Sequence, residues 1–223
     1  MTDPHPTHGP DTGPGAHTRE ALLDAAQELF AERGIASSSL RAITAAAGAN
    51  LAAVSYHFGS KEGLVRALFQ RGLRPLNDER LRRLDACEAA ADPPAVPAVV
   101  AAFVAPVVEK MQSREERGFA RLVGRVFWEP DDGTRRLLLA EFRHVLERFA
   151  AALARALPGL PPSELHWRFH FMVGAMVHSV GQADLIERAS GGLCDPGDLT
   201  AGLTAFLTAG WQAPPATEEK RDS

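Results

Sequence analysis

A short stretch of the sequence, AGANLAAVSYHFGSKEGL at residues 47–64, places polar and basic side chains among alanines and glycines. Its residues that can donate hydrogen bonds or carry a positive charge are Asn50, Ser55, Tyr56, His57 and Lys61. Side chains of these types suit contact with phosphate oxygens, and the small residues between them allow a partner surface to approach closely. The pattern therefore indicates a binding surface and is unusual for a buried helix.

The region around this stretch is basic although the whole chain is acidic. The chain has 223 residues and a net charge of −4. Between residues 39 and 71, the charged residues are Arg41, Lys61, Arg66 and Arg71 against Glu62 alone. Phosphate contact needs only such a local surplus, because counterion release depends on the number of phosphates that are neutralised.

Helical periodicity runs through nearly all of the chain between its two ends, and no segment alternates as a strand would. We therefore expect an all-α fold of about nine helices. Pro75 and Pro106 should bend the helices that contain them, because proline removes a backbone hydrogen bond. The expected N-caps are Thr18, a serine among residues 37–39, Asn50, Ser60 and Ser113. The expected helices are 18–34, 37–48, 50–59, 60–90, 93–112, 113–128, 133–157, 163–189 and 195–210.

The second and third expected helices are short and are joined by Gly48 and Ala49. Helices of this length cannot bury their own apolar faces, and a tight glycine turn sets them at a steep angle. Braced by the first helix, to which Phe58 should pin the third, they form a helix-turn-helix whose last helix fits the major groove of double-stranded DNA. The expected DNA-contacting residues are Ser39, Arg41, Asn50, Leu51, Ala52, Ala53, Ser55, Tyr56, His57 and Lys61.

Two motifs in this region are specific. The pattern L-x-x-A-x-x-L-F-x-x-x-G lies within residues 22–34, and Y-H-F-x-S-K-E-x-L spans residues 56–64. With these motifs, residues 18–68 resemble the DNA-binding domain of the TetR family of transcriptional repressors. Leu51 and Ala52 depart from the lysine and glycine that many relatives have early in the recognition helix. The resemblance implies DNA contacts from Tyr56, His57 and Lys61.

The expected helix at residues 163–189 is apolar nearly all round, so it must be covered on both sides. We predict that one side packs on its own domain and the other on the same helix of a second chain, although a monomer with a very deep core is an alternative. Together with the last helix it would form a four-helix bundle across a two-fold axis. Such a homodimer presents two recognition helices and predicts a palindromic operator. The expected interface residues are Trp167, Phe171, Gly174, His178, Gly181, Leu203 and Phe206.

Residues 86–210 are rich in aromatic and methionine side chains with a few polar groups. That composition is typical of an apolar ligand pocket and equally of a filled core. The segments 50–64, 119–127 and 164–175 resemble the PsrA-type, fatty-acid-responsive branch of the TetR family, which implies a long-chain fatty acid or acyl-CoA as the first candidate effector. Its carboxylate could lie on Arg121 or His170. The expected pocket residues are Phe103, Arg121, Arg125, Trp128, His170 and Met176.

The expected domain organisation is a disordered arm at residues 1–17, a DNA-binding domain at 18–71, a ligand-binding and dimerisation domain at 72–212, and a loose tail at 213–223. The helix at residues 60–90 enters both domains. An effector could therefore tilt it, with Pro75 as the flexing point, and change the spacing of the two recognition helices.

Other classes of protein lack their signatures here. The sequence has no phosphate-binding loop, nucleophile elbow or H-E-x-x-H motif, which argues against an enzyme. His166 and His170 have a legitimate metal spacing without a clear third ligand, so neither a metal nor a cofactor is expected. Cys87 and Cys194 should be free thiols, and the absence of an apolar span or leader predicts a cytoplasmic protein without a membrane partner. A non-specific architectural DNA binder remains a rival interpretation.

Overall fold

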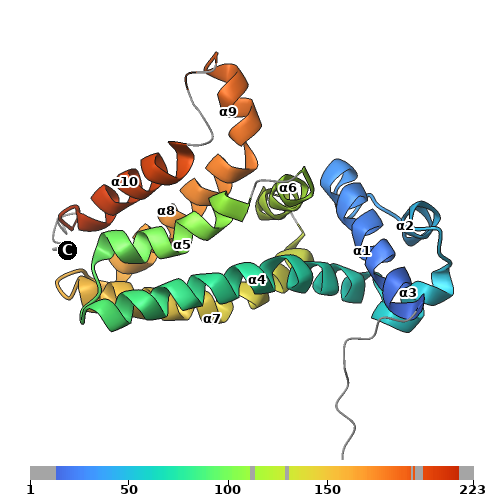
Figure 1. Ribbon diagram of the computed structural model, residues 1–223, viewed down its shortest axis with the longest axis horizontal. Helices are drawn as coiled ribbons and strands as arrows, with labels where there is room; N and C mark the ends of the chain where they lie inside the picture. Colours follow the sequence, from blue (N-terminus) through green and yellow to red (C-terminus); the bar gives the residue numbers. More distant parts are fainter. Residues whose placement is uncertain (1–13, 111–113, 129–130, 192, 194–197, 216–223) are drawn as a thin grey trace, which may run out of the picture. The chain divides into compact units, whose positions relative to one another are not determined.

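The computed structural model of the chain describes residues 14–110, 114–128, 131–191, 193 and 198–215. Within these ranges the regular secondary structure is helical and no strand is present, so the expected all-α fold is confirmed. The described ranges hold ten helices, one more than expected. They are labelled in Figure 1 and are α1 (Pro14–Arg33), α2 (Leu40–Ala46), α3 (Leu51–Phe58), α4 (Lys61–Ala90), α5 (Val96–Lys110), α6 (Arg114–Trp128), α7 (Asp132–Ala156), α8 (Pro162–Gly181), α9 (Ala183–Ala189) and α10 (Leu199–Gln212).

The chain divides into two compact units, Met1–Leu68 and Phe69–Ser223. The first unit contains α1, α2 and α3, and the second contains α5 to α10. Helix α4 begins in the first unit and continues into the second without interruption. The division falls slightly before the expected boundary at residues 71 and 72.

Polar caps and glycines define the two short helices of the first unit, as expected. The side-chain oxygen of Ser39 accepts a hydrogen bond at 3.2 Å from an amide in the first turn of α2, and that of Asn50 accepts one at 2.9 Å from the first turn of α3. Gly48 and Gly59 follow the two helices with φ of 61° and 74°. Glycine adopts these angles without the strain that a Cβ atom would bring, so the helix ends are set locally.

Helix α1 begins earlier than expected, at Pro14. Proline is favourable in the first turn of a helix because its missing N–H would have no helical partner there. Thr18 therefore lies inside α1 and is not its N-cap. Residues 14–17 are helical and do not belong to a disordered arm, and residues 1–13 lie outside the described residues.

The core of the first unit joins α1, α2 and α3 to the start of α4. Leu22, Phe30 and Ile43 are fully buried, as are Val54 of α3 and Leu64 of α4. Full burial of a side chain of this size contributes about 1.5–3 kcal/mol to stability. Val54 is the fully buried residue of α3, and several other side chains of this helix stay accessible.

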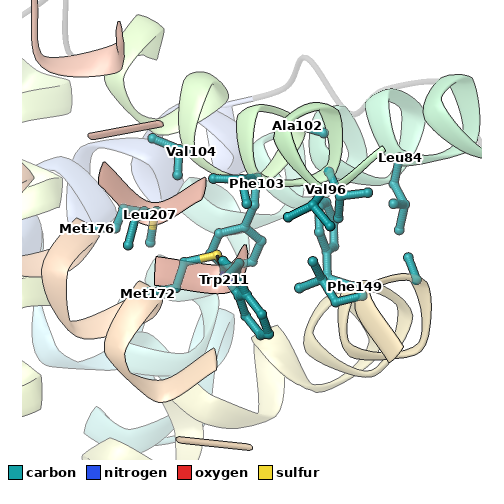
Figure 2. Packing of buried hydrophobic residues seen from close by; sticks show 14 of the residues in the cluster. Leu84, Val96, Ala102, Phe103, Val104, Phe149, Met172, Met176, Leu207 and Trp211 are labelled. Atoms are coloured by element: carbon teal, nitrogen blue, oxygen red, sulfur yellow. Dashed lines mark hydrogen bonds between the residues drawn. The ribbon is translucent and has the colours of Figure 1, made fainter. Parts of the chain in front are cut away.

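The core of the second unit lies among α4, α5, α7, α8 and α10 (Figure 2). Phe103 of α5 packs edge to face on Phe149 of α7, with ring centroids 5.0 Å apart. Trp211 of α10 is buried, and its indole N–H points to the sulfur of Met172 at 3.4 Å. These contacts hold α10 against α5 and α8.

The apolar segment at residues 163–189 forms two helices, where one was expected. Helix α8 ends at Gly181 and α9 starts at Ala183, because Gln182 between them has φ of −116° and ψ of 11°, outside the α-helical range. Glycine followed by a polar residue weakens a helix at this point, a feature that the strong apolar periodicity obscured. The expectation of a single helix here was wrong.

Other helix ends also differ from expectation. Helix α5 starts at Val96, after Pro93 and Pro94, and α10 starts at Leu199. Helix α7 begins one residue early because Asp131, which was not recognised as a cap, accepts hydrogen bonds from the first-turn amides. These bonds and one from the Thr134 hydroxyl lower the pKa of Asp131. Ser113 of the expected capping box lies outside the described residues.

The two internal prolines do not end their helices. Helix α4 continues through Pro75 to Ala90, and α5 continues through Pro106 to Lys110. Tertiary packing on both sides of each proline outweighs the lost backbone hydrogen bond.

Arg168 of α8 holds the end of α10. Its Nη1 atom donates to the carbonyl oxygens of Trp211 at 2.9 Å and Ala213 at 2.7 Å, and its Nη2 atom donates to that of Pro214 at 2.9 Å. Nε donates to the carboxylate of Glu164 at 3.0 Å. A guanidinium thus caps the C-terminal carbonyls of α10 from a neighbouring helix and complements the helix dipole. The expected loose tail from residue 213 is therefore wrong for its first residues.

Replacement of Arg168 by methionine should lower the free energy of unfolding by about 1–3 kcal/mol, because several carbonyl groups lose a charged donor. Urea denaturation followed by circular dichroism measures this change. Arg168→Lys keeps the charge but not the fork of donors, and we expect a smaller loss. A methionine variant as stable as the wild type would show that solvent replaces this cap without cost.

Candidate DNA-binding and effector sites

Helix α3 presents small and polar side chains to solvent. Tyr56 is 84% exposed, and Ala52 and Ser55 are also exposed. Leu51 at the start of the helix is an exposed apolar side chain. With Val54 as its buried anchor, α3 has the accessible, small-sided face that a major-groove helix needs.

The remaining predicted DNA contacts lie around this face. Arg41 of α2 is exposed, as are the caps Ser39 and Asn50, whereas Ala53 is half-buried. His57 is half-buried, and its ring meets that of Tyr56 edge to face at a centroid distance of 4.9 Å. The first unit therefore brings these residues to the surface around α2 and α3.

Phe58 was expected to pin α3 to α1, and it is half-buried in the structure. The guanidinium of Arg19 in α1 lies 5.6 Å from the centroid of its ring. This cation–π contact joins the C-terminal end of α3 to α1.

Lys61 has a structural contact that sequence reasoning missed. Its ammonium donates to the carbonyl oxygens of Ile35 and Ala36, and it lies 6.0 Å from the ring centroid of Phe30. The lysine thus ties the start of α4 to the connection that follows α1. Its phosphate contact stays a prediction. Arg66 also forms an exposed ion pair with Glu62, which reduces the free positive charge on this turn of α4.

Most of the expected dimer residues form an exposed apolar surface on α8 and α10. Trp167 is 58% exposed, Phe171 is 60% exposed and Phe206 is 72% exposed. The rings of Trp167 and Phe171 stack with centroids 5.8 Å apart. A Cβ atom built on Gly174 or Gly181 would meet no atom within 4 Å, so another chain could approach the backbone there.

His178 and Leu203, two further residues of the expected interface, differ in their exposure to solvent. His178 is exposed beside this apolar surface, whereas Leu203 is buried in the core of the second unit. Leu203 also lines a groove of about 520 Å³ among α8, α9 and α10. Its main contribution is to the protomer, because a buried side chain cannot supply much new contact area.

The expected effector residues that the structure describes divide into buried and exposed side chains. Phe103 and Met176 are buried, whereas Arg121, Arg125 and His170 are exposed. The side chain of Trp128 lies outside the described residues. Arg121 and His170, the expected carboxylate-binding groups, are exposed in the single chain, and their assignment to the carboxylate stays a prediction.

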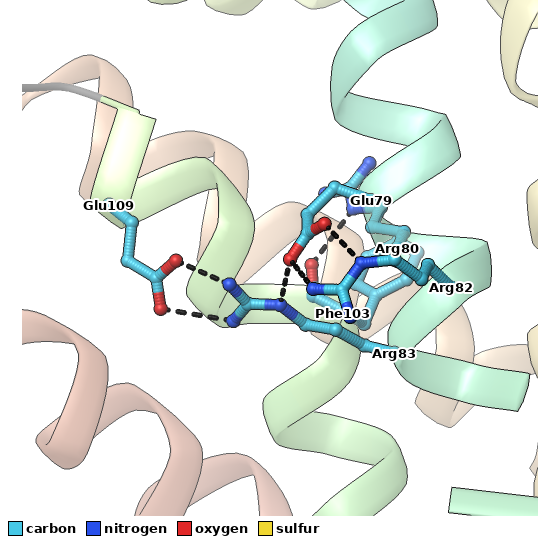
Figure 3. Close-up of polar contacts among 6 residues, drawn as sticks. All are labelled: Glu79, Arg80, Arg82, Arg83, Phe103 and Glu109. Atoms are coloured by element: carbon cyan, nitrogen blue, oxygen red, sulfur yellow. Dashed lines mark hydrogen bonds and ion pairs between the residues drawn. The ribbon is translucent and has the colours of Figure 1, made fainter. Parts of the chain in front are cut away.

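Sequence reasoning missed the polar group that does lie beside Phe103 and Met176. Arg80 of α4 is fully buried and donates from Nε to the carbonyl oxygen of Phe103 at 2.9 Å (Figure 3). Its position had a recognisable pattern, because it falls on the same helical stripe as Leu73, Leu76 and Leu84. The neighbouring charges in NDERLRR made it look like part of a solvated face.

The arginines next to Arg80 differ from it in their partners. Glu79 pairs with Arg82 and Arg83, and Arg83 also forms a two-point ion pair with Glu109 of α5 (Figure 3). Hydrogen bonds from Arg82 and Arg83 lower the pKa of Glu79 to about 2. The carboxylates of this region are therefore ionised and engaged on the surface at neutral pH.

The described residues bear on three features that the sequence predicted to be absent, namely a metal site, a membrane-spanning helix and a disulfide. They contain no group of three or more histidine, cysteine or acidic side chains arranged for a metal ion. No described helix combines the length and the hydropathy that crossing a lipid bilayer requires. Cys87 is a free thiol, and Cys194 lies outside the described residues.

In the first unit, the exposed helix α3 follows α2 after a tight turn, and a larger helical unit comes next in the chain. This arrangement defines a helix-turn-helix regulator with a separate C-terminal domain. Two family models match the corresponding parts of the chain. Residues 22–68 match the bacterial regulatory proteins of the tetR family, and residues 101–210 match the tetracyclin repressor-like C-terminal domain. The chain belongs to the TetR family of transcriptional regulators, which are not enzymes.

Curated relatives match part of the chain. The HTH-type transcriptional repressor BepR of Brucella suis is 36% identical over 67 residues, which cover 30% of this chain and 32% of BepR. The chain thus matches about a third of the length of this curated relative.

Solved structures share the fold over most of the chain. FadR of Bacillus subtilis in complex with stearoyl-CoA is 15% identical with a TM-score of 0.64, and the match covers 86% of this chain and 98% of FadR. The SmeT–triclosan complex is 26% identical with a TM-score of 0.60, and the match covers 85% of this chain and 90% of SmeT.

Proposed function

We propose that the protein is a ligand-responsive repressor that binds a palindromic operator as a homodimer and is released by a small apolar effector. The observation that carries this proposal is the combination, in one chain, of an exposed recognition helix and an exposed aromatic surface on α8 and α10. The first suits a DNA groove, and the second suits a copy of the same chain.

The homodimer rests on the exposed aromatic surface. Trp167, Phe171 and Phe206 leave much of their rings in water, and exposed apolar patches of this kind mark interaction sites. The open glycines between them allow helices to pack closely. A two-fold axis would pair each surface with itself and would present two α3 helices to DNA. Two half-sites about 34–36 Å apart would then be read together.

The operator contact rests on the chemistry of α3. Ala52 and Ser55 allow the helix to approach base edges, and Tyr56 at the far end can donate to a phosphate. The amides at the start of α3, beside Asn50, can bind a second phosphate. Arg41 and Lys61 add positive charge on either side.

The effector proposal rests on the aromatic interior of the second unit. A protein of similar fold holds stearoyl-CoA, which carries a long hydrocarbon chain, and another holds triclosan, a largely apolar molecule. A long-chain fatty acid or acyl-CoA is therefore the first candidate effector. Helix α4 belongs to both units, so a ligand that favours one arrangement of α4 would couple effector binding to operator binding reciprocally. Pro75 remains the proposed flexing point.

A gel-shift series on the intergenic DNA next to the gene tests this function. A full palindrome should bind the wild type at least about 100-fold more tightly than a single half-site, because the second contact is intramolecular. Tyr56→Ala should weaken binding about 10-fold without a change in thermal stability, since the side chain is exposed. Arg136→Ala, a change on α7 in the second unit, is the control. Equal affinity for all duplexes would instead indicate a non-specific architectural protein.

A further inference from the structure

Arg80 is a cation in the core of the second unit. Its side chain is 1% exposed, and its guanidinium carbon lies 4.1 Å from the ring centroid of Phe103 and 5.9 Å from that of Phe142. Nε donates to the carbonyl oxygen of Phe103, and Nη2 lies 3.3 Å from the sulfur of Met176. The surroundings of the charge are therefore aromatic rings, a thioether and one carbonyl group.

This charge is not fully compensated within the described part of the chain. The Nη1 atom of Arg80 is buried without a hydrogen-bond partner, and no described carboxylate forms an ion pair with the residue. A thioether sulfur is only a weak acceptor. One turn earlier on α4, the side-chain oxygen of Asn77 is also buried without a partner. Buried polar atoms are nearly always satisfied, so two exceptions on successive turns indicate a missing polar guest.

The nearby acidic residues cannot supply the missing partner. Glu79 and Glu109 are engaged by Arg82 and Arg83 outside the core. Burial lowers the pKa of Arg80 to about 9, which still leaves the guanidinium charged at neutral pH. An unpaired buried charge is costly, and an anion inside the core would relieve that cost.

We propose that Arg80 binds the carboxylate of an amphipathic acid, whose apolar part lies among Phe103, Phe142 and Met176. This inference rests on the proposed function, in which the second unit receives an apolar effector. The two Nη atoms of a guanidinium match the two oxygens of a carboxylate. One oxygen takes the open donor of Nη1, and the other replaces the sulfur of Met176 on Nη2. Methionine is flexible enough to move aside.

The same geometry selects the free acid over its coenzyme A ester. A thioester carbonyl is neutral and leaves the charge of Arg80 without a counter-ion. The diphosphate of coenzyme A would bring several negative charges towards one guanidinium among aromatic rings. Removing water from those charges there would cost much free energy. A single carboxylate on a hydrocarbon chain matches both the charge and the apolar surroundings.

Isothermal titration of the full chain with decanoate, decanol and decanoyl-CoA tests the inference, with oleate and oleyl alcohol as a second chain length. The wild type should bind each acid about 10-fold to 100-fold more tightly than the matching alcohol. In Arg80→Gln this preference should disappear, with the affinity for the alcohol unchanged. Arg82→Gln, a matched change on the surface of the same helix, should keep the preference.

Two results would overturn the inference. One is seen with the wild type alone: it binds the alcohol or decanoyl-CoA as tightly as the acid, or it binds no acid at all. The other is a folded Arg80→Gln that retains the preference for the acid. Should Arg80→Gln fail to fold by circular dichroism, Arg80→Met replaces it, and an undiminished preference there has the same meaning because methionine has neither the charge nor the donors. Operator release by decanol or decanoyl-CoA would sink this inference and leave the proposed function intact.

Discussion

Replacement of Gly63 by alanine is expected to destabilise the first unit by about 3 kcal/mol or more and to abolish operator binding. A Cβ atom at Gly63 would lie 2.0 Å from the carbonyl oxygen of Phe58. That oxygen belongs to the backbone at the end of α3, so relief requires α3 and α4 to move apart. The movement would displace Tyr56 and His57, which lie in the last turn of α3.

Two other glycines in helices provide a graded comparison. At Gly72 an added Cβ would lie 2.2 Å from the ring of Phe119, a side chain that can shift, and we expect a loss of about 1–2 kcal/mol. At Gly118 it would meet no atom within 4 Å, and alanine should stabilise the helix by about 0.5–1 kcal/mol. Calorimetric unfolding and gel shifts measure both effects. The loss of stability should be largest for Gly63, smaller for Gly72 and absent for Gly118. Any other order would refute the argument from backbone contact.

If the protein forms the proposed homodimer, Phe171→Asp is expected to convert it to a monomer and to weaken operator binding about 100-fold. The ring is 60% exposed in the single chain and stacks with Trp167. A carboxylate there costs little in the monomer, but across a two-fold axis it would bury charge against an apolar surface. Sedimentation velocity should give a mass near the 23.9 kDa of one chain instead of twice that value.

Leu139→Asp provides the matched control. Leu139 is also an exposed apolar residue of the second unit, but it belongs to α7 and not to α8 or α10. The control should retain the dimer and the affinity for the operator. A wild type that is already monomeric, or a Phe171→Asp variant that still dimerises, would show that this surface has another partner.

The first unit could be predicted well because its structure is determined by local chemistry. Ser39 and Asn50 cap their own helices, and Gly48 and Gly59 adopt backbone angles that other residues rarely adopt. Each of these choices is readable over a few residues. The sequence missed the start of α1 at Pro14, and it missed the bond from Lys61 to the carbonyl of Ile35, which joins residues far apart in the sequence.

The interior of the second unit could not be predicted in the same way. Arg80 and Arg82 have similar neighbours in the sequence, yet one is buried and the other is exposed. What separates them is the direction of each side chain relative to α5, α7 and α8, which depends on packing between helices. The same limit hid the exposure of Arg121 and His170, which stand among aromatic residues in the sequence. It also hid the break at Gln182, where strong apolar periodicity outweighed a weak local preference.

Arg168 donates hydrogen bonds to the carbonyl oxygens of Ala213 and Pro214, so the folded domain extends to Pro214. APPATEEKRDS reads as dispensable from its first letter, but its opening residues are acceptors for a side chain on another helix. A deletion that trims the terminus should therefore spare everything up to Pro214, since an earlier cut would release α10 and with it Phe206. A version of the protein shortened for crystallisation can therefore end directly after Pro214.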